Sequence, residues 1–126
     1  MITYVDRSLV RAGRLAELRA AITELAVFIE ANEPMILAYN VYFDPDGSAM
    51  TVVHLHADAA SLAFHLQIAG PRFPAFAAYV QMQSIDIYGE PGDDVVAQLR
   101  AKAQALGSGI VRVHNHHAGF NRVGQK

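Results

Sequence analysis

Hydrophobic and polar residues alternate along some stretches of the chain and recur every three or four residues along others. The alternating stretches are rich in residues that favour strands, and they predict strands at about 2–10, 35–43, 49–56, 82–89 and 110–117. The other repeat puts apolar residues on one side of a helix. It predicts helices at about 13–32, 59–69 and 93–106, with a short helical segment at 73–80.

Turn and capping residues support these boundaries. Asp44-Pro45-Asp46-Gly47 predicts a hairpin between the second and third strands, and Asp58 is the expected N-cap of the second helix. The order is βαββαβ followed by αβ. This order predicts an α+β, ferredoxin-like fold, in which an antiparallel sheet carries both main helices on one face. We expect a single domain at 1–126, with a core at about 1–90 and a C-terminal αβ extension at 91–126.

The αβ extension has two possible roles. Its strand could extend the sheet, or it could cross to a second subunit and lock a dimer. Val111 and Val113 give this strand an apolar side that needs cover. We therefore expect the dimer role.

Side chains alternate across a strand, so each predicted strand divides into two sets. One set is nearly all apolar and is expected under the helices: Val5, Leu9, Tyr39, Val41, Phe43, Val53, Leu55, Ile85 and Ile87. The other set has no Lys or Glu but carries tyrosines, histidines and short carboxylates: Tyr4, Asp6, Ser8, Ala38, Asn40, Tyr42, Val52, His54, His56, Ser84, Asp86 and Tyr88. We expect the second set to form one face that a second copy of the chain encloses as a pocket wall. The alternative is an ordinary exposed face.

Composition narrows the classes of function. Charged residues make up only 17% of the 126 residues, which favours oligomerisation, and the ten Lys and Arg residues are scattered, which argues against nucleic-acid binding. The chain has no Cys, so disulfides, thiolate catalysis and Cys-based metal sites are excluded. No apolar run approaches the ~20 residues of a membrane span, and no signal-peptide pattern is present. We expect a cytoplasmic protein.

The segment 52–79, VVHLHADAASLAFHLQIAGPRFPAFAAY, resembles the antibiotic-biosynthesis-monooxygenase family of dimeric α/β barrels. In that family a strand precedes an Asp-capped helix that contains a histidine, and a phenylalanine follows in the next turn. Asp58, His65 and Phe73 occupy these positions. The segment 87–91 is similar to the last core strand of the family, so the resemblance covers about residues 1–90.

The resemblance implies a homodimer with one pocket per subunit, between sheet and helices. Its characterised members include cofactor-free oxygenases of phenols or hydroquinones and haem-degrading enzymes. Here His56 stands where the family usually has Trp, and the chain has no Trp. Asp6 stands where the haem-degrading members carry Asn. These departures argue against haem, and we expect no cofactor.

Two histidines are the candidate catalytic groups. His65 or His54 would take a proton from a phenolic substrate, because a neutral imidazole is a suitable base near pH 7. A histidine at the core edge, bonded to a backbone carbonyl, is the alternative for His65. The expected substrate-binding residues are Asn40, Tyr42, His56, Phe73, Asp86 and Tyr88. For several of these, packing at a dimer interface is the alternative.

The histidines also form two His-x-His pairs, His54/His56 and His114/His116. Both rings of a pair could point at one metal ion, so a His-ligated metalloprotein is one alternative function. A non-catalytic ligand-binding module is the other. The leading hypothesis is a dimeric barrel that binds a small organic molecule, as a cofactor-independent monooxygenase of an aromatic or quinol-like substrate without a metal.

Overall fold

The structure is a computed structural model that describes residues 1–123. Its elements follow the predicted order closely: β1 (Ile2–Val10), α1 (Leu15–Asn32), β2 (Ile36–Phe43), β3 (Ala49–His56), α2 (Ala59–Ala69), the 3-10 helix η1 (Gly70–Ala78), β4 (Val80–Tyr88), α3 (Asp93–Leu106) and β5 (Val111–His114). None of the helices within 1–123 is long and apolar enough to cross a membrane.

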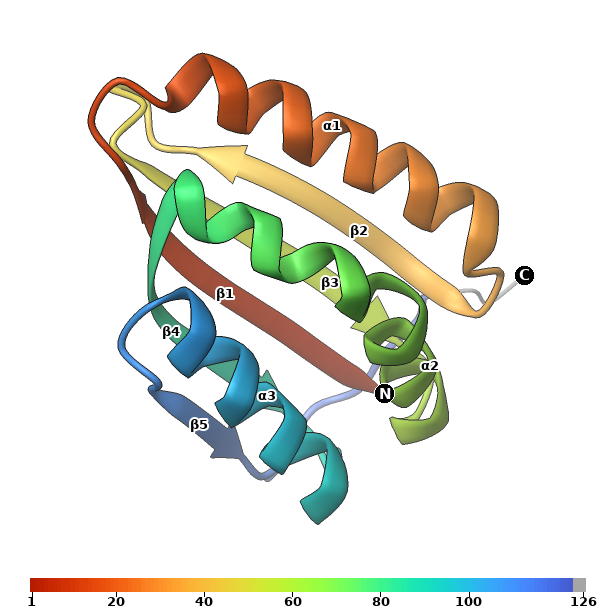
Figure 1. Cartoon of the computed structure of the whole chain (residues 1–126). Coiled ribbons are helices and arrows are strands. Elements are labelled where there is room, and N and C mark those ends of the chain that lie inside the picture. The colour runs from red at the N-terminus through yellow and green to blue at the C-terminus, as the bar shows by residue number, and fades with distance from the viewer. Residues whose placement is uncertain (124–126) are drawn as a thin grey trace.

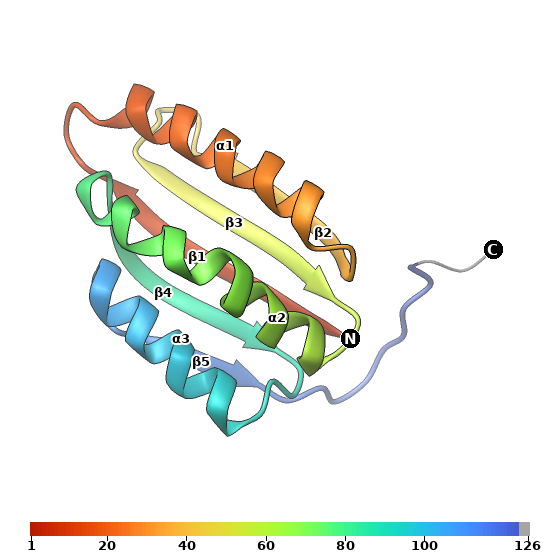
Figure 2. The same cartoon turned by 45° about the vertical axis from the view of Figure 1, so that its right-hand side comes forward.

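The strands form one sheet in the order β2-β3-β1-β4-β5. The first four strands pair antiparallel, and β5 pairs parallel to β4. The three α-helices and η1 lie on the same face of the sheet, and within residues 1–123 the opposite face carries no helix (Figures 1 and 2). The predicted α+β, ferredoxin-like arrangement is confirmed.

The C-terminal αβ unit extends the protein's own sheet. Helix α3 crosses over the helix-covered face and returns the chain to β5, where Val111 lies opposite Ile85 and Val113 opposite Ile87. Val111 packs against the core of its own subunit. The strand extends the sheet of its own chain, so the expectation that it crosses to a partner was wrong. Val111 is covered within the chain, whereas Val113 is 42% exposed.

Local signals explain how the helices are held. Leu18, Ile22, Leu25 and Ile29 are the buried residues of α1, at the three- and four-residue spacing that places them on one side. Asp58 caps α2 as predicted, because its carboxylate accepts a hydrogen bond of 2.9 Å from the backbone N–H of Ser61.

The two faces of the sheet are composed differently from the prediction. The sets of β2 and β4 lie as expected, but those of β1 and β3 are exchanged. Tyr4, Asp6 and Ser8 of β1, with His54 and His56 of β3, face the helices and are buried. Alternation tells which residues of one strand share a side, but not which sides of neighbouring strands lie on the same face of the sheet. The pairing register decides that. Tyr4 lies opposite His54 of β3 and opposite Ile87 of β4, so these three residues share a face.

Candidate functional site

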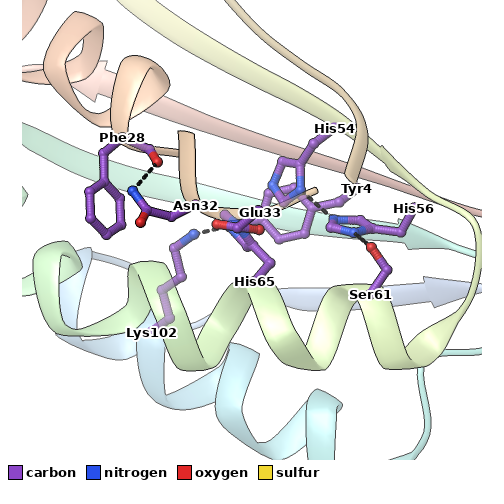
Figure 3. A network of polar contacts seen from close by, with 9 residues as sticks. All are labelled: Tyr4, Phe28, Asn32, Glu33, His54, His56, Ser61, His65 and Lys102. Carbon is purple, nitrogen blue, oxygen red and sulfur yellow. Dashed lines mark hydrogen bonds and ion pairs between the residues drawn. The ribbon is translucent and has the colours of Figure 1, made fainter. Parts of the chain in front are cut away.

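A cluster of polar side chains lies buried between the sheet and the helices (Figure 3). Its members come from five elements and one helix end: Tyr4, Asp6 and Ser8 from β1, Glu33 from the end of α1, Tyr39 from β2, His54 and His56 from β3, Ser61 and His65 from α2, and Lys102 from α3. Buried polar groups are costly unless they are hydrogen-bonded, so the bonding within the cluster decides what each member can do.

His65 and Glu33 form a buried imidazole–carboxylate pair. Nδ1 of His65 lies 3.0 Å and 2.9 Å from the two carboxylate oxygens of Glu33, and both side chains are about 1% exposed. A carboxylate accepts, so Nδ1 carries the hydrogen that it donates. Nε2 is then the ring atom that can take or give a proton. The alternative predicted for His65 was a hydrogen bond to a backbone carbonyl. The ring bonds to the Glu33 carboxylate instead.

His54, His56 and Ser61 form a chain of hydrogen bonds from β3 to α2 (Figure 3). Nδ1 of His54 lies 2.8 Å from Nε2 of His56, and Nδ1 of His56 lies 2.7 Å from the hydroxyl of Ser61. Burial lowers the pKa of His56 to about 4 and holds the pKa of His54 well below its usual value near 6.5. Both rings are therefore neutral at pH 7.

Tyr4, Asp6 and Lys102 form the third part of the cluster. The hydroxyl of Tyr4 donates to Oδ2 of Asp6 at 2.7 Å and accepts from Nζ of Lys102 at 2.6 Å. Nζ itself lies 3.6 Å from Oδ2. Burial raises the pKa of Asp6, although Lys102 and the Tyr4 bond oppose the shift, and burial lowers the pKa of Lys102.

Aromatic rings join these parts. The ring centroid of His54 lies 3.8 Å from that of Tyr4 and 4.6 Å from that of His65. Tyr39 and Phe73 lie nearby, with ring centroids 6.1 Å and 5.9 Å from that of His65. The surroundings of His65 thus combine one proton-transfer group with flat apolar surfaces, as in sites that hold small organic molecules.

The predicted site residues divide between the two faces. His54, His56, His65 and Phe73 gather on the helix-covered face. Asn40, Tyr42, Asp86 and Tyr88 lie on the open face, because Asn40 is level with Val53 and Asp86 with Val5. Asp86 there binds Arg112 and His114, and the ring of Tyr88 stacks on His114 with centroids 4.5 Å apart. The eight predicted site residues therefore do not line one pocket within a single subunit.

The His-x-His pairs do not converge on a common atom. The rings of His54 and His56 bond to each other, and His114 bonds to Asp86. Within 1–123, no three His, Asp or Glu side chains are grouped in a way that could hold a metal ion. Nδ1 of His54, both ring nitrogens of His56 and Nε2 of His114 are thus engaged in hydrogen bonds.

The sequence analysis did not predict Glu33 and Lys102 as site residues, although their spacing from buried apolar residues could have indicated them. Glu33 follows Leu25 and Ile29 at the same four-residue spacing, so it continues the buried side of α1. Lys102 lies three residues after Leu99 and four before Leu106, both buried. A charged residue that continues an apolar stripe must be buried or end the stripe. Here Glu33 is buried, and the side chain of Lys102 is only 10% exposed.

No known family model matches the chain, and no curated protein matches it in sequence. Solved structures do match. MupZ from Pseudomonas fluorescens has a TM-score of 0.73 at 16% identity, over 96% of this chain and 88% of that protein. SnoaB, a cofactor-independent oxygenase from Streptomyces nogalater, has a TM-score of 0.60 at 19% identity, over 73% and 94%.

A further match is an antibiotic biosynthesis monooxygenase with a TM-score of 0.58 at 18% identity, over 69% of this chain and 93% of that one. At such identities the likeness defines the fold. The chain has the fold of the antibiotic biosynthesis monooxygenases, as the sequence resemblance predicted. The match to MupZ takes in 96% of the chain, so it includes α3 and β5, which that resemblance left out.

Proposed function

We propose that this protein binds a small organic molecule beside the buried polar cluster and removes a proton from it, as a cofactor-independent monooxygenase of an aromatic or quinol-like compound. The Glu33–His65 pair carries the proposal. Glu33 orients the ring and stabilises its charged form, and Nε2 serves as the base. A phenol that has lost its proton is far more easily oxidised than the neutral molecule.

The groups around His65 suit such a substrate. Tyr39 and Phe73 offer flat surfaces on which an aromatic ring can pack. His54 is neutral and lies next to His65, so it adds polar contact without adding charge. These contacts favour a planar substrate that enters as an uncharged molecule.

The reaction needs only the substrate and O₂. Loss of the phenolic proton to His65 gives an electron-rich anion, which is oxidised as O₂ is reduced. A C–O bond forms at a ring carbon that bore hydrogen, and the O–O bond then breaks. One oxygen atom remains in the quinone. The other leaves as water, which takes one hydrogen from that ring carbon and one proton from His65. The sum is one phenol and one O₂ giving one quinone and one water.

We also propose that two copies associate through the open face of the sheet. Val5, Val53 and Leu55 lie within it, and Leu9, Tyr42 and Tyr88 are exposed there. Contiguous exposed apolar surface is typical of interaction sites. In such a dimer Asn40, Tyr42, Asp86 and Tyr88 serve the interface in place of the pocket. A cytoplasmic location stays a prediction from the sequence.

Oxygen uptake tests the enzyme. The substrates are 1-naphthol, 1,4-dihydroxynaphthalene and a panel of hydroquinones, each with the wild type, His65→Ala, His54→Ala and Glu33→Gln. We expect turnover in the wild type and a loss of roughly 100-fold in His65→Ala, the usual contribution of one acid–base group. Glu33→Gln should lower the rate and shift its pH profile. His116→Ala, at an exposed position, is the matched control and should behave as the wild type.

Two results would reject the oxygenase. One is the absence of uptake with every compound, and the other is uptake that neither His65→Ala nor Glu33→Gln changes. If compounds raise the melting temperature of the protein and are recovered unaltered, the non-catalytic binding module replaces the enzyme.

A further inference from the structure

A small cavity lies next to the ring cluster, between the sheet and the helix layer. Its volume is about 30 Å³, which is the room that a single water-sized group takes. Tyr39 and Phe73, the rings near His65, both border it. Apolar side chains of α1, β3, η1 and β4 make up most of the remaining wall.

Two polar atoms interrupt this apolar wall. Oδ1 of Asp6 and the hydroxyl of Ser8 are buried, and neither has a hydrogen-bond partner among residues 1–123. Asp6 and Ser8 lie two residues apart on the helix-facing side of β1 and both line the cavity. A buried polar atom that is left unpaired destabilises the folded protein. Two such atoms facing one small cavity indicate a place for a polar group.

The two atoms define that group. The Asp6 carboxylate accepts hydrogen bonds, since its other oxygen already accepts from Tyr4 and lies beside Lys102. The Ser8 hydroxyl can donate or accept. A hydroxyl satisfies both, because it donates to Asp6 and accepts from Ser8. A carboxylate would be repelled by Asp6, and a methyl group would leave both atoms unpaired. We infer that Asp6 and Ser8 form a subsite for a terminal hydroxyl group of the ligand.

The rest of the ligand has room outside. An open depression of about 260 Å³ lies between η1 and α3, on the outer side of the helix layer. Phe73, Lys102 and Leu106 border both this depression and the cavity, so they form the wall between them. Nζ of Lys102 lies 4.0 Å from the centroid of the Phe73 ring. Of these three residues Lys102 has the longest flexible side chain, so passage through the wall requires its Nζ to leave the Tyr4 hydroxyl and Oδ2 of Asp6.

This geometry describes a ligand with an extended apolar body and one terminal hydroxyl. The body lies in the depression, and the hydroxyl passes Phe73 to reach Asp6 and Ser8. The inference rests on the proposed function for the place of the ligand, and it adds the chemical group by which the ligand is selected. It also gives α3 a role, since α3 brings Lys102 to Asp6.

Three naphthalene compounds test the subsite by fluorescence titration, which no Trp in the chain obscures. They are 2-naphthol, 2-methylnaphthalene, in which a methyl replaces the hydroxyl, and 2-naphthoate. We expect the wild type to bind 2-naphthol at least about 10-fold more tightly than either analogue, as one charge-assisted hydrogen bond allows. In Ser8→Ala and Asp6→Asn the preference should shrink several-fold. Ser84→Ala, on the open face of β4, is the matched control and should keep it.

Stability separates the subsite from a structural role of Ser8. Because the Ser8 hydroxyl is unpaired, Ser8→Ala should fold with a melting temperature at or above that of the wild type, while its preference for 2-naphthol falls. Equal binding of 2-naphthol and 2-methylnaphthalene, no binding of 2-naphthol, or an unchanged preference in Ser8→Ala would overturn the inference. A clear preference for 2-naphthol without oxygen uptake would keep the subsite and reject the oxygenase. His65-dependent uptake without that preference would do the reverse.

Discussion

His54 and His56 illustrate how a buried polar group can remain useful. Each ring is neutral because burial disfavours the charged form, and each keeps its hydrogen bond. Two neutral imidazoles and a hydroxyl in series can be bonded in either direction. Ser61 donates to His56 and His56 to His54, or the direction of both bonds is reversed. The chain could thus pass a proton along without holding a charge.

The same burial makes stability depend on pH. The folded pKa of His56 is about 4, and the unfolded value is about 6.5. As the pH falls below about 6.5, the unfolded chain binds protons that the folded chain does not, so the free energy of unfolding decreases until the pH reaches about 4. Between pH 7 and pH 5 we expect His56 to account for a loss of about 2 kcal/mol. Urea unfolding of the wild type and His56→Gln at both pH values checks this.

His56→Gln should lose about 2 kcal/mol less than the wild type over this range, whatever its stability at pH 7. The control His116→Gln, at an exposed position, should lose as much as the wild type. An equal loss in His56→Gln and the wild type would show that His56 titrates normally in the folded protein.

At the scale of elements, the sequence predicted the helices and strands well because their signals are local. Asp58 caps α2, and the 93–106 helix was predicted with the bounds that the structure has. The facing of β1 and β3 was not predictable by alternation, because the side of β1 that holds Asp6 and Ser8 is as polar as an exposed side. It is buried because Lys102 of α3 donates to the Tyr4 hydroxyl and lies beside the Asp6 carboxylate, and such pairing between elements has no signature within one strand.

The junction of α3 with the sheet depends on one glycine. Gly107 ends α3 with extended backbone and forms a bridge with Met82 of β4. A Cβ at Gly107 would overlap the carbonyl oxygen of Met82. We expect Gly107→Ala to lower the free energy of unfolding by about 1–3 kcal/mol, the usual cost of overpacking. Thermal unfolding measures it.

Gly70 provides the control for this substitution. Its backbone is helical, with φ of −50°, and a Cβ there meets no atom within 4 Å. Gly70→Ala should therefore leave stability unchanged or raise it by about 0.4–1 kcal/mol. If Gly107→Ala is as stable as Gly70→Ala, the close approach of α3 to β4 does not hold the extension in place.

For the whole molecule, the uneven cover of the sheet is the leading feature. All helices of the described part of the chain lie on one face (Figure 2), and the other face presents apolar residues to solvent. The low charge content favours an oligomer. Asn40, Tyr42, Asp86 and Tyr88, which were expected to line the pocket, lie on this open face. The low charge content indicates that part of the protein surface is covered by a partner. Only the register of the strands shows which residues lie on that part of the surface.

Sedimentation velocity tests the dimer. Val53 lies on the open face, level with Val5 and Asn40. We expect the wild type to sediment as two copies and Val53→Lys as one, with an unchanged circular dichroism spectrum, because a charge in the middle of a desolvated interface weakens association by several kcal/mol. Val27→Lys is the control, since Val27 is 63% exposed on α1. A monomeric wild type would remove the proposed interface.

The bond between Tyr4 and Lys102 joins residues that are 98 positions apart. During synthesis, β1 leaves the ribosome long before α3 exists. Until then Asp6 lacks the cation that lies beside it in the folded protein. The charge pairing at the heart of the site can form only after translation has passed Lys102. A chain that ends before Lys102 lacks the ammonium group that neutralises Asp6, so such a truncated product cannot form the buried ion pair.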